Sequence, residues 1–126
     1  MLDTCVLLDL PSLDLAVLPK SSEITAITLA ELHQGVAAAK DPTARTARTE
    51  ELGFALVSFD ALPFDGKAAA RYGSMVSLTL AAGRDPRPRR LDLMIAAIAS
   101  VHELPLYTRN TKDFQGLERL VEVVTV

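Results

Sequence analysis

Four acidic residues of this chain fall where a short apolar run gives way to a predicted helix or turn. They are Asp3, Glu31, Asp92 and Asp113. Ligands of an open parallel sheet bind beyond the carboxyl ends of its strands, so the four side chains are expected to meet at one edge. Carboxylates gathered there repel one another unless a cation balances them. Mg²⁺ and Mn²⁺ prefer carboxylate and water oxygens, and the predicted chemistry is therefore that of a divalent metal site.

Each of these acids also has an explanation that involves only helix stability. Thr28 and Glu31 fit a capping box, in which the Glu31 carboxylate would accept a hydrogen bond from the backbone at the helix start. Asp92 would complement the helix dipole in its first turn, and Asn110 with Asp113 is a variant of the capping box. One acid alone is explained by capping at least as well as by catalysis. The convergence of four acids on one sheet edge favours the metal site.

The other reactive side chains form no second recognisable site. His33 and His102 have no Cys or His partner at ligand spacing, which argues against zinc. His102 falls on the apolar stripe of its helix and is expected to be a core residue. Cys5 is the only cysteine and has no evident base partner, so it is interpreted as a structural thiol. No Ser–His–Asp or Cys–His pattern supplies a nucleophile, which is consistent with hydrolysis by water.

The elements that must position the acids alternate along the chain. Five short apolar runs lack strict polar alternation and suit strands buried on both faces. They are 1–2, 24–27, 55–57, 104–107 and 121–126. Three longer segments carry apolar residues at helical spacing, namely 28–39, 65–82 and 91–102. This alternation predicts βαβ crossovers and an α/β fold with a mostly parallel sheet covered on both faces.

Composition indicates the class of the chain and its compartment. Its 126 residues and 13.6 kDa, with 49% hydrophobic and 23% charged residues, suit one folded domain. A lone cysteine, no basic leader and no apolar run of about 18 residues predict a cytoplasmic protein that does not enter a membrane. The net charge is −3, but setting the four acids aside leaves 12 acidic residues against 13 basic ones. The acidic balance therefore does not exclude a nucleic-acid substrate.

Basic residues lie next to two of the four acids. The segment 84–90 holds four arginines and one aspartate just upstream of Asp92, and a second pair of basic residues precedes Asp113. Either a solvated loop or contact with the phosphate backbone of a nucleic acid would explain them. Their place beside the acids favours phosphate contact. The candidate contacts are Arg89, Arg90, Arg109 and Lys112.

Five sequence blocks follow one another over nearly the whole chain. They are Leu2-Asp3-Thr4 with Val6-Leu7-Leu8, Thr28–Leu32 with Gly35, Leu62–Asp65 with Ala69 and Tyr72-Gly73, Asp92–Ala97, and Leu104–Asn110 through Asp113-Phe114. With these blocks in this order, the chain resembles the PIN-domain nucleases, and among them the VapC-type toxins of bacterial toxin–antitoxin pairs. The resemblance implies a three-layer α/β/α fold with a twisted sheet of four to five strands, formed by a single PIN domain over residues 1–126.

The resemblance also implies an activity, a cofactor and partners. The implied metal-binding and catalytic residues are Asp3, Glu31, Asp92 and Asp113. The implied supporting residues are Thr4, Thr108 and Asn110. The implied activity is that of an endoribonuclease that depends on Mg²⁺ or Mn²⁺ and leaves 5′-phosphate and 3′-hydroxyl ends. A VapB-like antitoxin would hold the toxin inactive, and the toxin would form a homodimer.

Two departures from the family pattern are visible, and other functions stay open. Cys5 stands where family members often carry Ser or Thr, and a thiol is a poor replacement for a hydroxyl near a hard metal. Met1-Leu2 is a very short first strand.

The alternative functions are a PIN nuclease of RNA processing without a toxin role and a non-catalytic protein-binding module. A receiver-like phospho-acceptor domain fits less well, because Asp3 stands alone and Arg109-Asn110 occupies the late position where a lysine is expected.

Overall fold

The N-terminal residues lie between two pairs of parallel strands. A computed structural model describes all of the chain, Met1–Val126. The parallel pairs are β1 (Ile24–Thr25) with β2 (Ala61–Leu62) and β3 (Leu106–Thr108) with β4 (Val123–Thr125). Leu2 forms a parallel bridge with Tyr107 of β3, and its N–H donates to the carbonyl of Glu23 beside β1 at 2.9 Å. The predicted mostly parallel sheet is therefore present, although each of its strands is short.

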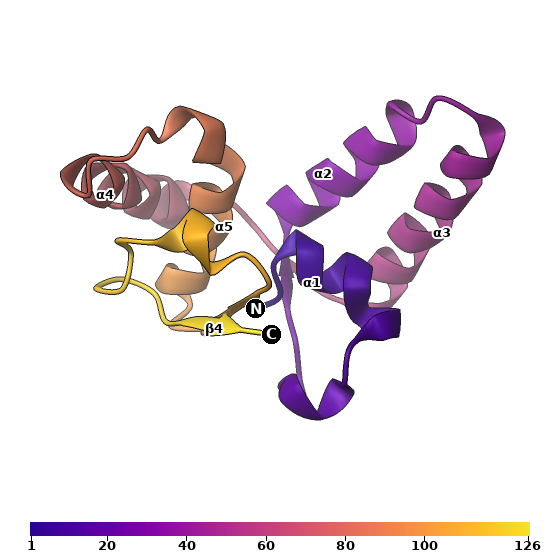
Figure 1. The fold of residues 1–126 in the computed structure, drawn as a ribbon, viewed down its shortest axis with the longest axis horizontal. Coiled ribbons are helices and arrows are strands. Elements are labelled where there is room, and N and C mark those ends of the chain that lie inside the picture. The colour runs from indigo at the N-terminus through magenta and orange to yellow at the C-terminus, as the bar shows by residue number, and fades with distance from the viewer.

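Helices lie on both sides of this sheet. The α-helices are α1 (Thr4–Asp9), α2 (Ala26–Ala37), α3 (Pro42–Ser58), α4 (Gly66–Ala81) and α5 (Arg90–Val101). Short 3₁₀ helices are η1 (Leu10–Ser12), η2 (Leu15–Val17), η3 (Arg87–Arg89) and η4 (Thr111–Phe114). Figure 1 shows α1, α2 and α3 on one side of the N-terminus, and α4 and α5 on the other. None of these helices combines the length and the apolar character needed to cross a membrane.

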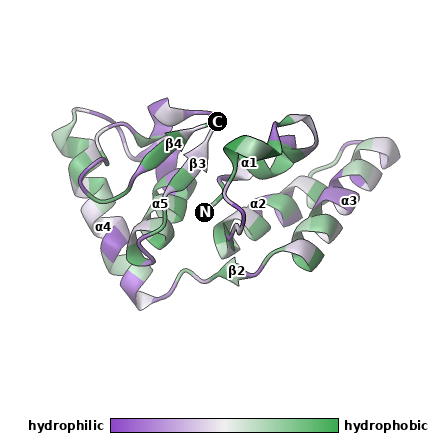
Figure 2. Cartoon of the chain, turned by 90° about the horizontal axis from the view of Figure 1, so that it is seen from below, coloured by the Kyte–Doolittle hydropathy of each residue, from purple (hydrophilic) through white to green (hydrophobic).

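Two hydrophobic clusters form because neighbouring residues of the central segment point to opposite faces of the sheet. Met1 packs into a cluster of 13 buried residues with α4 and α5, whereas Leu2 packs into a cluster of seven with α1, α2 and α3. Both side chains are almost fully buried. In the first cluster, α5 is the most deeply buried helix and is hydrophobic along most of its length (Figure 2). The sheet thus holds both helical layers in place.

One predicted strand is wrong, because residues 55–57 lie in the last turns of α3. Asp41 caps this helix, its side chain accepting from the Ala44 N–H at 2.8 Å, and Pro42 occupies the first helical position. Leu52 and Ala55, three residues apart, are the buried positions of the helix, and Val57 is exposed. A short apolar run has the same composition in a strand and in a helix that buries one face. The strand itself follows at Ala61–Leu62.

The three predicted helices agree with α2, α4 and α5 to within two residues at each end. α2 begins at Ala26 because Thr25 caps it, its hydroxyl accepting from the Thr28 N–H at 3.0 Å. α4 begins after Asp65, whose carboxylate accepts from the Ala68 N–H at 2.9 Å. The prediction that His102 lies in the core is wrong. This residue follows the last turn of α5, where its side chain is exposed.

Candidate active site

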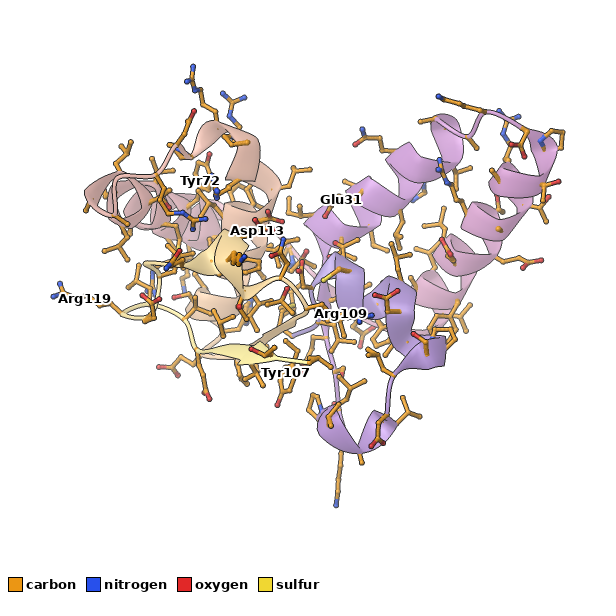
Figure 3. All side chains as sticks on the ribbon, in the orientation of Figure 1. Glu31, Tyr72, Tyr107, Arg109, Asp113 and Arg119 are labelled. Atoms are coloured by element: carbon orange, nitrogen blue, oxygen red, sulfur yellow. The ribbon has the colours of Figure 1, made fainter.

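The four predicted acids come from four different elements on one side of the sheet. Asp3 follows the central segment and caps α1; Glu31 lies on α2, after β1. Asp92 lies in the first turn of α5, and Asp113 lies in η4, after β3. Figure 3 labels Glu31 on α2 and Asp113 on η4. Asp3 is buried and the other three are partly exposed, so the region is open to solvent.

The carboxylates are close enough for their charges to raise the pKa of two of them, Asp92 and Glu31. Burial, followed by repulsion from Asp3, Asp113 and Glu31, raises the pKa of Asp92 to about 7, and Arg89 opposes this only in part. Burial also raises the pKa of Glu31; the Thr4 hydroxyl counters that shift and the Asp3 charge adds to it. The fold therefore concentrates negative charge here without enough basic side chains to balance it, as the strand-end argument predicted.

The supporting residues each hold one acid. The Thr4 hydroxyl donates to Glu31 Oε1 at 2.7 Å, and the Thr108 hydroxyl donates to Asp3 Oδ2 at 2.7 Å. The side-chain amide of Asn110 donates to Asp113 Oδ2. These bonds fix the directions of three carboxylates and leave Asp92 without a side-chain hydrogen bond from the protein.

The helix-capping explanation fails for Glu31 and holds for Asp3. Because Thr25 is the N-cap of α2, Glu31 lies in the second turn, beyond the position that a capping box requires. Asp3 does cap α1, with its Oδ1 accepting from the Thr4 N–H at 2.8 Å, while its Oδ2 serves the site. Asp92 lies near the start of α5, but a carboxylate stabilised mainly by the helix dipole would have a lowered pKa, and that of Asp92 is raised.

The donor chemistry fits a hard divalent cation bound through few protein ligands. No three Asp, Glu, His or Cys side chains are placed so that one ion could contact them all. Mg²⁺ usually keeps several waters and binds proteins through one or two carboxylates, so it does not require three. The unbalanced negative charge around Asp92 is the observation that calls for a cation. That the four acids bind metal stays a prediction.

Cys5, which stands in place of a hydroxyl residue, still forms a hydrogen bond with Asp3. Its thiol donates to Asp3 Oδ2 at 3.2 Å and lies 3.6 Å from the Thr108 hydroxyl. Burial, as the main cause, raises the pKa of the Cys5 thiol, which keeps it protonated and able to donate at neutral pH. The thiol thus makes a contact with Asp3 of the kind that a hydroxyl would make.

The predicted phosphate contacts differ in how they are held. Arg89 ends η3 beside the acids; its Nη1 donates to the Asp85 carbonyl at 3.0 Å, while its buried Nε–H has no hydrogen-bond partner. Arg109 forms an exposed ion pair with Asp9 of α1 at 2.8 Å. Arg90 and Lys112 are exposed. Of these four residues, Arg89 is the one whose charge lowers the pKa of Asp92.

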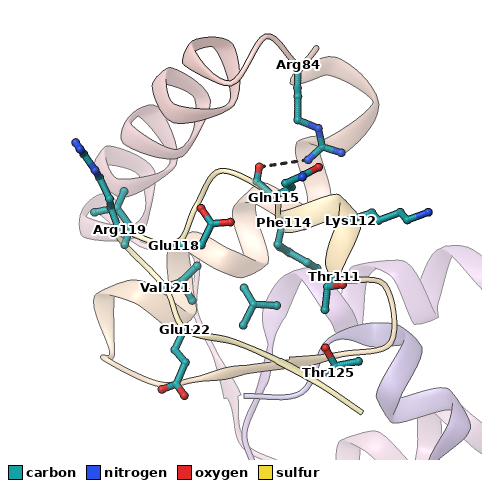
Figure 4. A pocket seen from close by; sticks show the side chains of 12 residues that line it. Arg84, Thr111, Lys112, Phe114, Gln115, Glu118, Arg119, Val121, Glu122 and Thr125 are labelled. Atoms are coloured by element: carbon teal, nitrogen blue, oxygen red, sulfur yellow. Dashed lines mark hydrogen bonds between the residues drawn. The ribbon is translucent and has the colours of Figure 1, made fainter.

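A large cavity of the chain is separate from the site of the acids. It has a volume of about 960 Å³ and lies between η4, the C-terminal segment and Arg84, whose guanidinium donates to the Gln115 carbonyl at 3.3 Å (Figure 4). None of the four acids lines it. A smaller cavity beside Glu31, of about 410 Å³, touches the site.

A curated relative decides the family. The chain is 35% identical over 131 aligned residues to Ribonuclease VapC5 of Mycobacterium tuberculosis (strain ATCC 25618 / H37Rv), and the alignment covers the whole chain and 94% of that relative. The chain belongs to the VapC family. No family model matches the chain. Membership of the VapC family confirms the resemblance read from the five sequence blocks.

Solved structures agree with the VapC assignment. VapBC-5 from Mycobacterium tuberculosis, a member of the VapBC family of toxin–antitoxin systems, contains a chain that superposes with a TM-score of 0.83 at 34% identity, covering 99% of this chain and 94% of that one. FitAcB from Neisseria gonorrhoeae gives 0.75 at 31% identity, over 97% and 94% of the two chains. The predicted α/β fold of the PIN type is therefore confirmed.

One residue of this VapC-family site was not singled out from the sequence. Thr28 is fully buried in α2, and its hydroxyl lies 3.0 Å from that of Thr4. Because Thr4 gives its proton to Glu31, Thr28 must donate to Thr4; Thr28 accepts in turn from Thr25 at 3.3 Å. A chain of three hydroxyls thus ends on the Glu31 carboxylate. In the sequence, Thr28 is named as a possible helix cap and as the start of the Thr28–Leu32 block, but not as a hydrogen-bond partner within the site.

We expect Thr28→Val to lower the kcat of RNA cleavage about tenfold, because losing one donor frees the Thr4 hydroxyl from its orientation toward Glu31. The KM should not change, and Thr28→Ser should restore kcat. The matched control is Thr79→Val, which removes a buried hydroxyl bonded only to the Met75 carbonyl of α4. Equal kcat values for Thr28→Val and Thr79→Val would contradict a positioning role for Thr28.

Proposed function

We propose that this chain is a Mg²⁺- or Mn²⁺-dependent endoribonuclease that acts as the toxin of a VapBC-type toxin–antitoxin pair. The observation that carries the proposal is the placement of four carboxylates from separate elements on one side of the sheet, close enough for three of them, together with burial, to raise the pKa of Asp92. Family membership supports RNA as the substrate, since the curated relative is itself a ribonuclease. A binding-only module would have no need to gather four unbalanced acids.

The metal would be held by carboxylates of Asp3, Asp92, Glu31 and Asp113, in groups of one or two per ion with water completing the shell. When bound, such a cation withdraws electron density from the phosphoryl group, lowers the pKa of water and stabilises the leaving oxygen. Hydrolysis adds water across the P–O3′ bond, so the products are a 5′-phosphate and a 3′-hydroxyl.

The protein's own residues orient the acids and hold the RNA backbone. Thr4, Thr108 and Asn110 keep three carboxylates in fixed directions before the substrate arrives. The guanidinium of Arg89, whose charge acts on Asp92, is placed to contact a phosphate of RNA bound at the acids. Arg90, Arg109 and Lys112 are the exposed cations around the same region. Lys112, on η4, precedes Asp113 and extends away from the large cavity (Figure 4).

The same proposal includes partners. The similarity to VapBC-5 supports a VapB-like antitoxin as the protein that holds this chain inactive. A homodimer of the toxin is proposed with it. The functional unit in each copy is one PIN domain over residues 1–126.

The deciding experiment measures cleavage of an unstructured RNA by the purified full chain. We expect cleavage in Mg²⁺ or Mn²⁺, loss of at least about 10³-fold in the rate with EDTA, and recovery when the metal is added back. End labelling should identify 5′-phosphate products. Cleavage that persists in EDTA would refute metal dependence.

Arg89→Ala should weaken RNA binding and flatten its salt dependence. Arg87→Ala, which removes an exposed cation already paired with Asp85, should change both less.

A further inference from the structure

A cavity opens directly beside the carboxylates, between α1, α2 and α3. We name this space of about 410 Å³ the flank cavity; Thr4 and Glu31 line it at the site, and Gln34, Arg48 and Glu51 line it further out. Its size falls within the range of pockets that hold small organic groups. Because Thr4 and Glu31 line it, the flank cavity is within reach of a nucleotide next to a phosphate bound at the acids. The inference that follows therefore rests on the proposed ribonuclease activity.

The polar groups of the flank cavity are free to bind a ligand. Arg48 Nη1 donates to the Gly35 carbonyl at 2.7 Å, which fixes the guanidinium and leaves its other N–H groups without a protein acceptor. Glu51 forms no hydrogen bond or ion pair, although Arg48 lies three residues earlier on the same face of α3. Gln34 likewise uses neither its amide donor nor its acceptor. A carboxylate and a guanidinium thus stand side by side, unpaired.

We propose that the flank cavity binds a guanine base next to the cleaved phosphate, with Arg48 and Glu51 reading its edge. A carboxylate needs two adjacent donors, and guanine offers N1–H beside N2–H₂. The O6 and N7 acceptors of guanine follow along the same base and match the two-donor face of an arginine. Arg48 and Glu51 are neighbours on one helix face, so both can meet one base. Gln34, across the cavity on α2, completes the polar lining.

The other bases fit this pair less well. Adenine places the N1 lone pair beside its N6 donor, and cytosine places the N3 lone pair beside its N4 donor. Uracil has one donor between two carbonyl oxygens. Each of these edges sets a lone pair against the Glu51 carboxylate, and this repulsion disfavours the other bases at the site. No aromatic side chain lines the flank cavity, so recognition there relies on base edges rather than on stacking.

The first test maps cleavage of unstructured RNAs that differ at one position beside the cut. Wild-type kcat/KM should favour guanine over adenine, and Glu51→Gln should reduce that ratio about tenfold, because an amide offers one acceptor in place of two. Arg48→Lys, which keeps the charge but not the planar donors, should reduce it as well. The matched controls are Glu50→Gln and Arg45→Ala, on the same helix but outside the flank cavity. A ratio unchanged in Glu51→Gln overturns the proposal.

The second test does not depend on cleavage. GMP, AMP, CMP and UMP are titrated separately into the full chain, and binding is followed by the NMR signal of the Arg48 side chain. GMP should bind about tenfold more tightly than the others, and Glu51→Gln should abolish the difference. Preference for GMP in a chain that cleaves no RNA would refute the proposed activity and leave the guanine site standing. Cleavage without base preference, with equal or absent binding of the four nucleotides, overturns the site alone.

A protein partner is the other macromolecule that could occupy the flank cavity. Affinity for the cognate antitoxin should be the same in Glu51→Gln as in Glu50→Gln. If Glu51→Gln lowers antitoxin affinity and leaves the guanine-to-adenine ratio unchanged, the cavity belongs to the protein partner and the guanine proposal fails. Arg48 also holds the end of α2 through the Gly35 carbonyl, so replacing it acts on the fold as well. Thermal unfolding of Arg48→Lys and Glu51→Gln therefore checks that the compared proteins are folded.

Discussion

Replacing Asp92 with asparagine is expected to abolish RNA cleavage and, in the metal-free protein, to raise the free energy of unfolding. Asp92 is the carboxylate whose ionisation burial and the charges of Asp3, Asp113 and Glu31 oppose most strongly. An amide removes that repulsion and at the same time removes a proposed metal ligand. We expect the cleavage rate to fall by about 10³-fold or more. Stability and activity should therefore change in opposite directions.

The stability gain of Asp92→Asn should depend on pH. In the folded chain the pKa of Asp92 is about 7, whereas its ordinary value is 3.8. Between these values the folded state holds a proton that the unfolded state has released, so the free energy of unfolding of the wild type falls as the pH rises from about 4 to about 7. Above pH 7 both states are ionised and the penalty is constant. Allowing for solvent screening of a partly exposed group, we expect a penalty of about 1 to 2 kcal/mol.

The measurement is urea unfolding of both proteins in EDTA at several pH values, together with the cleavage assay in Mg²⁺. Asp92→Asn should match the wild type near pH 4 and exceed it near pH 8. Asp60→Asn is the matched control, since Asp60 is an exposed aspartate outside the site and its replacement should leave stability and activity unchanged. Equal stability of Asp92→Asn and the wild type at pH 8, or retained cleavage, would contradict the role given to Asp92.

The positions of the four acids could be predicted because they depend on topology. A parallel sheet brings its carboxyl ends to one edge, so the acids could be chosen from their place after strands and at helix starts, without any distance. The partners of each acid could not be predicted in this way. That the Thr4 hydroxyl bonds Glu31 depends on how α1 approaches α2 across 27 residues of sequence. That the Thr108 hydroxyl bonds Asp3 depends on how β3 approaches the N-terminal segment across 105 residues.

The two main errors come from residues that carry more than one local signal. Residues 55–57 are apolar enough for a strand, but Asp41-Pro42 is a helix-start signal, and the helix that begins there continues to Ser58. Thr25 and Thr28 are both good N-caps, and the end of β1 at Thr25 gives that residue the role. Thr28 is thereby released from capping and becomes a buried donor to Thr4. In both cases the decision between two local signals was made by tertiary structure.

Replacing Asp3 with asparagine should also abolish cleavage but, unlike Asp92→Asn, should destabilise the fold. Asp3 is 6% exposed, and its two oxygens accept from three donors: the Thr4 N–H at 2.8 Å, the Thr108 hydroxyl at 2.7 Å and the Cys5 thiol at 3.2 Å. An asparagine has one oxygen. If that oxygen keeps the Thr4 N–H and the α1 cap, its NH₂ group faces two donors.

The Thr108 hydroxyl cannot adjust easily to Asp3→Asn, because its oxygen already accepts from the Asn110 N–H at 3.1 Å. Leaving a buried donor unsatisfied costs about 1 to 3 kcal/mol, and we expect a loss of that size in the free energy of unfolding. Asp65→Asn is the matched control, since Asp65 caps α4 with one oxygen at an exposed position and asparagine is an equally good cap. Asp3→Asn should thus lower both stability and cleavage, Asp92→Asn only cleavage, and Asp65→Asn neither. Similar stability for Asp3→Asn and Asp65→Asn would show that the hydrogen bonds of Asp3 hold the site without holding the fold.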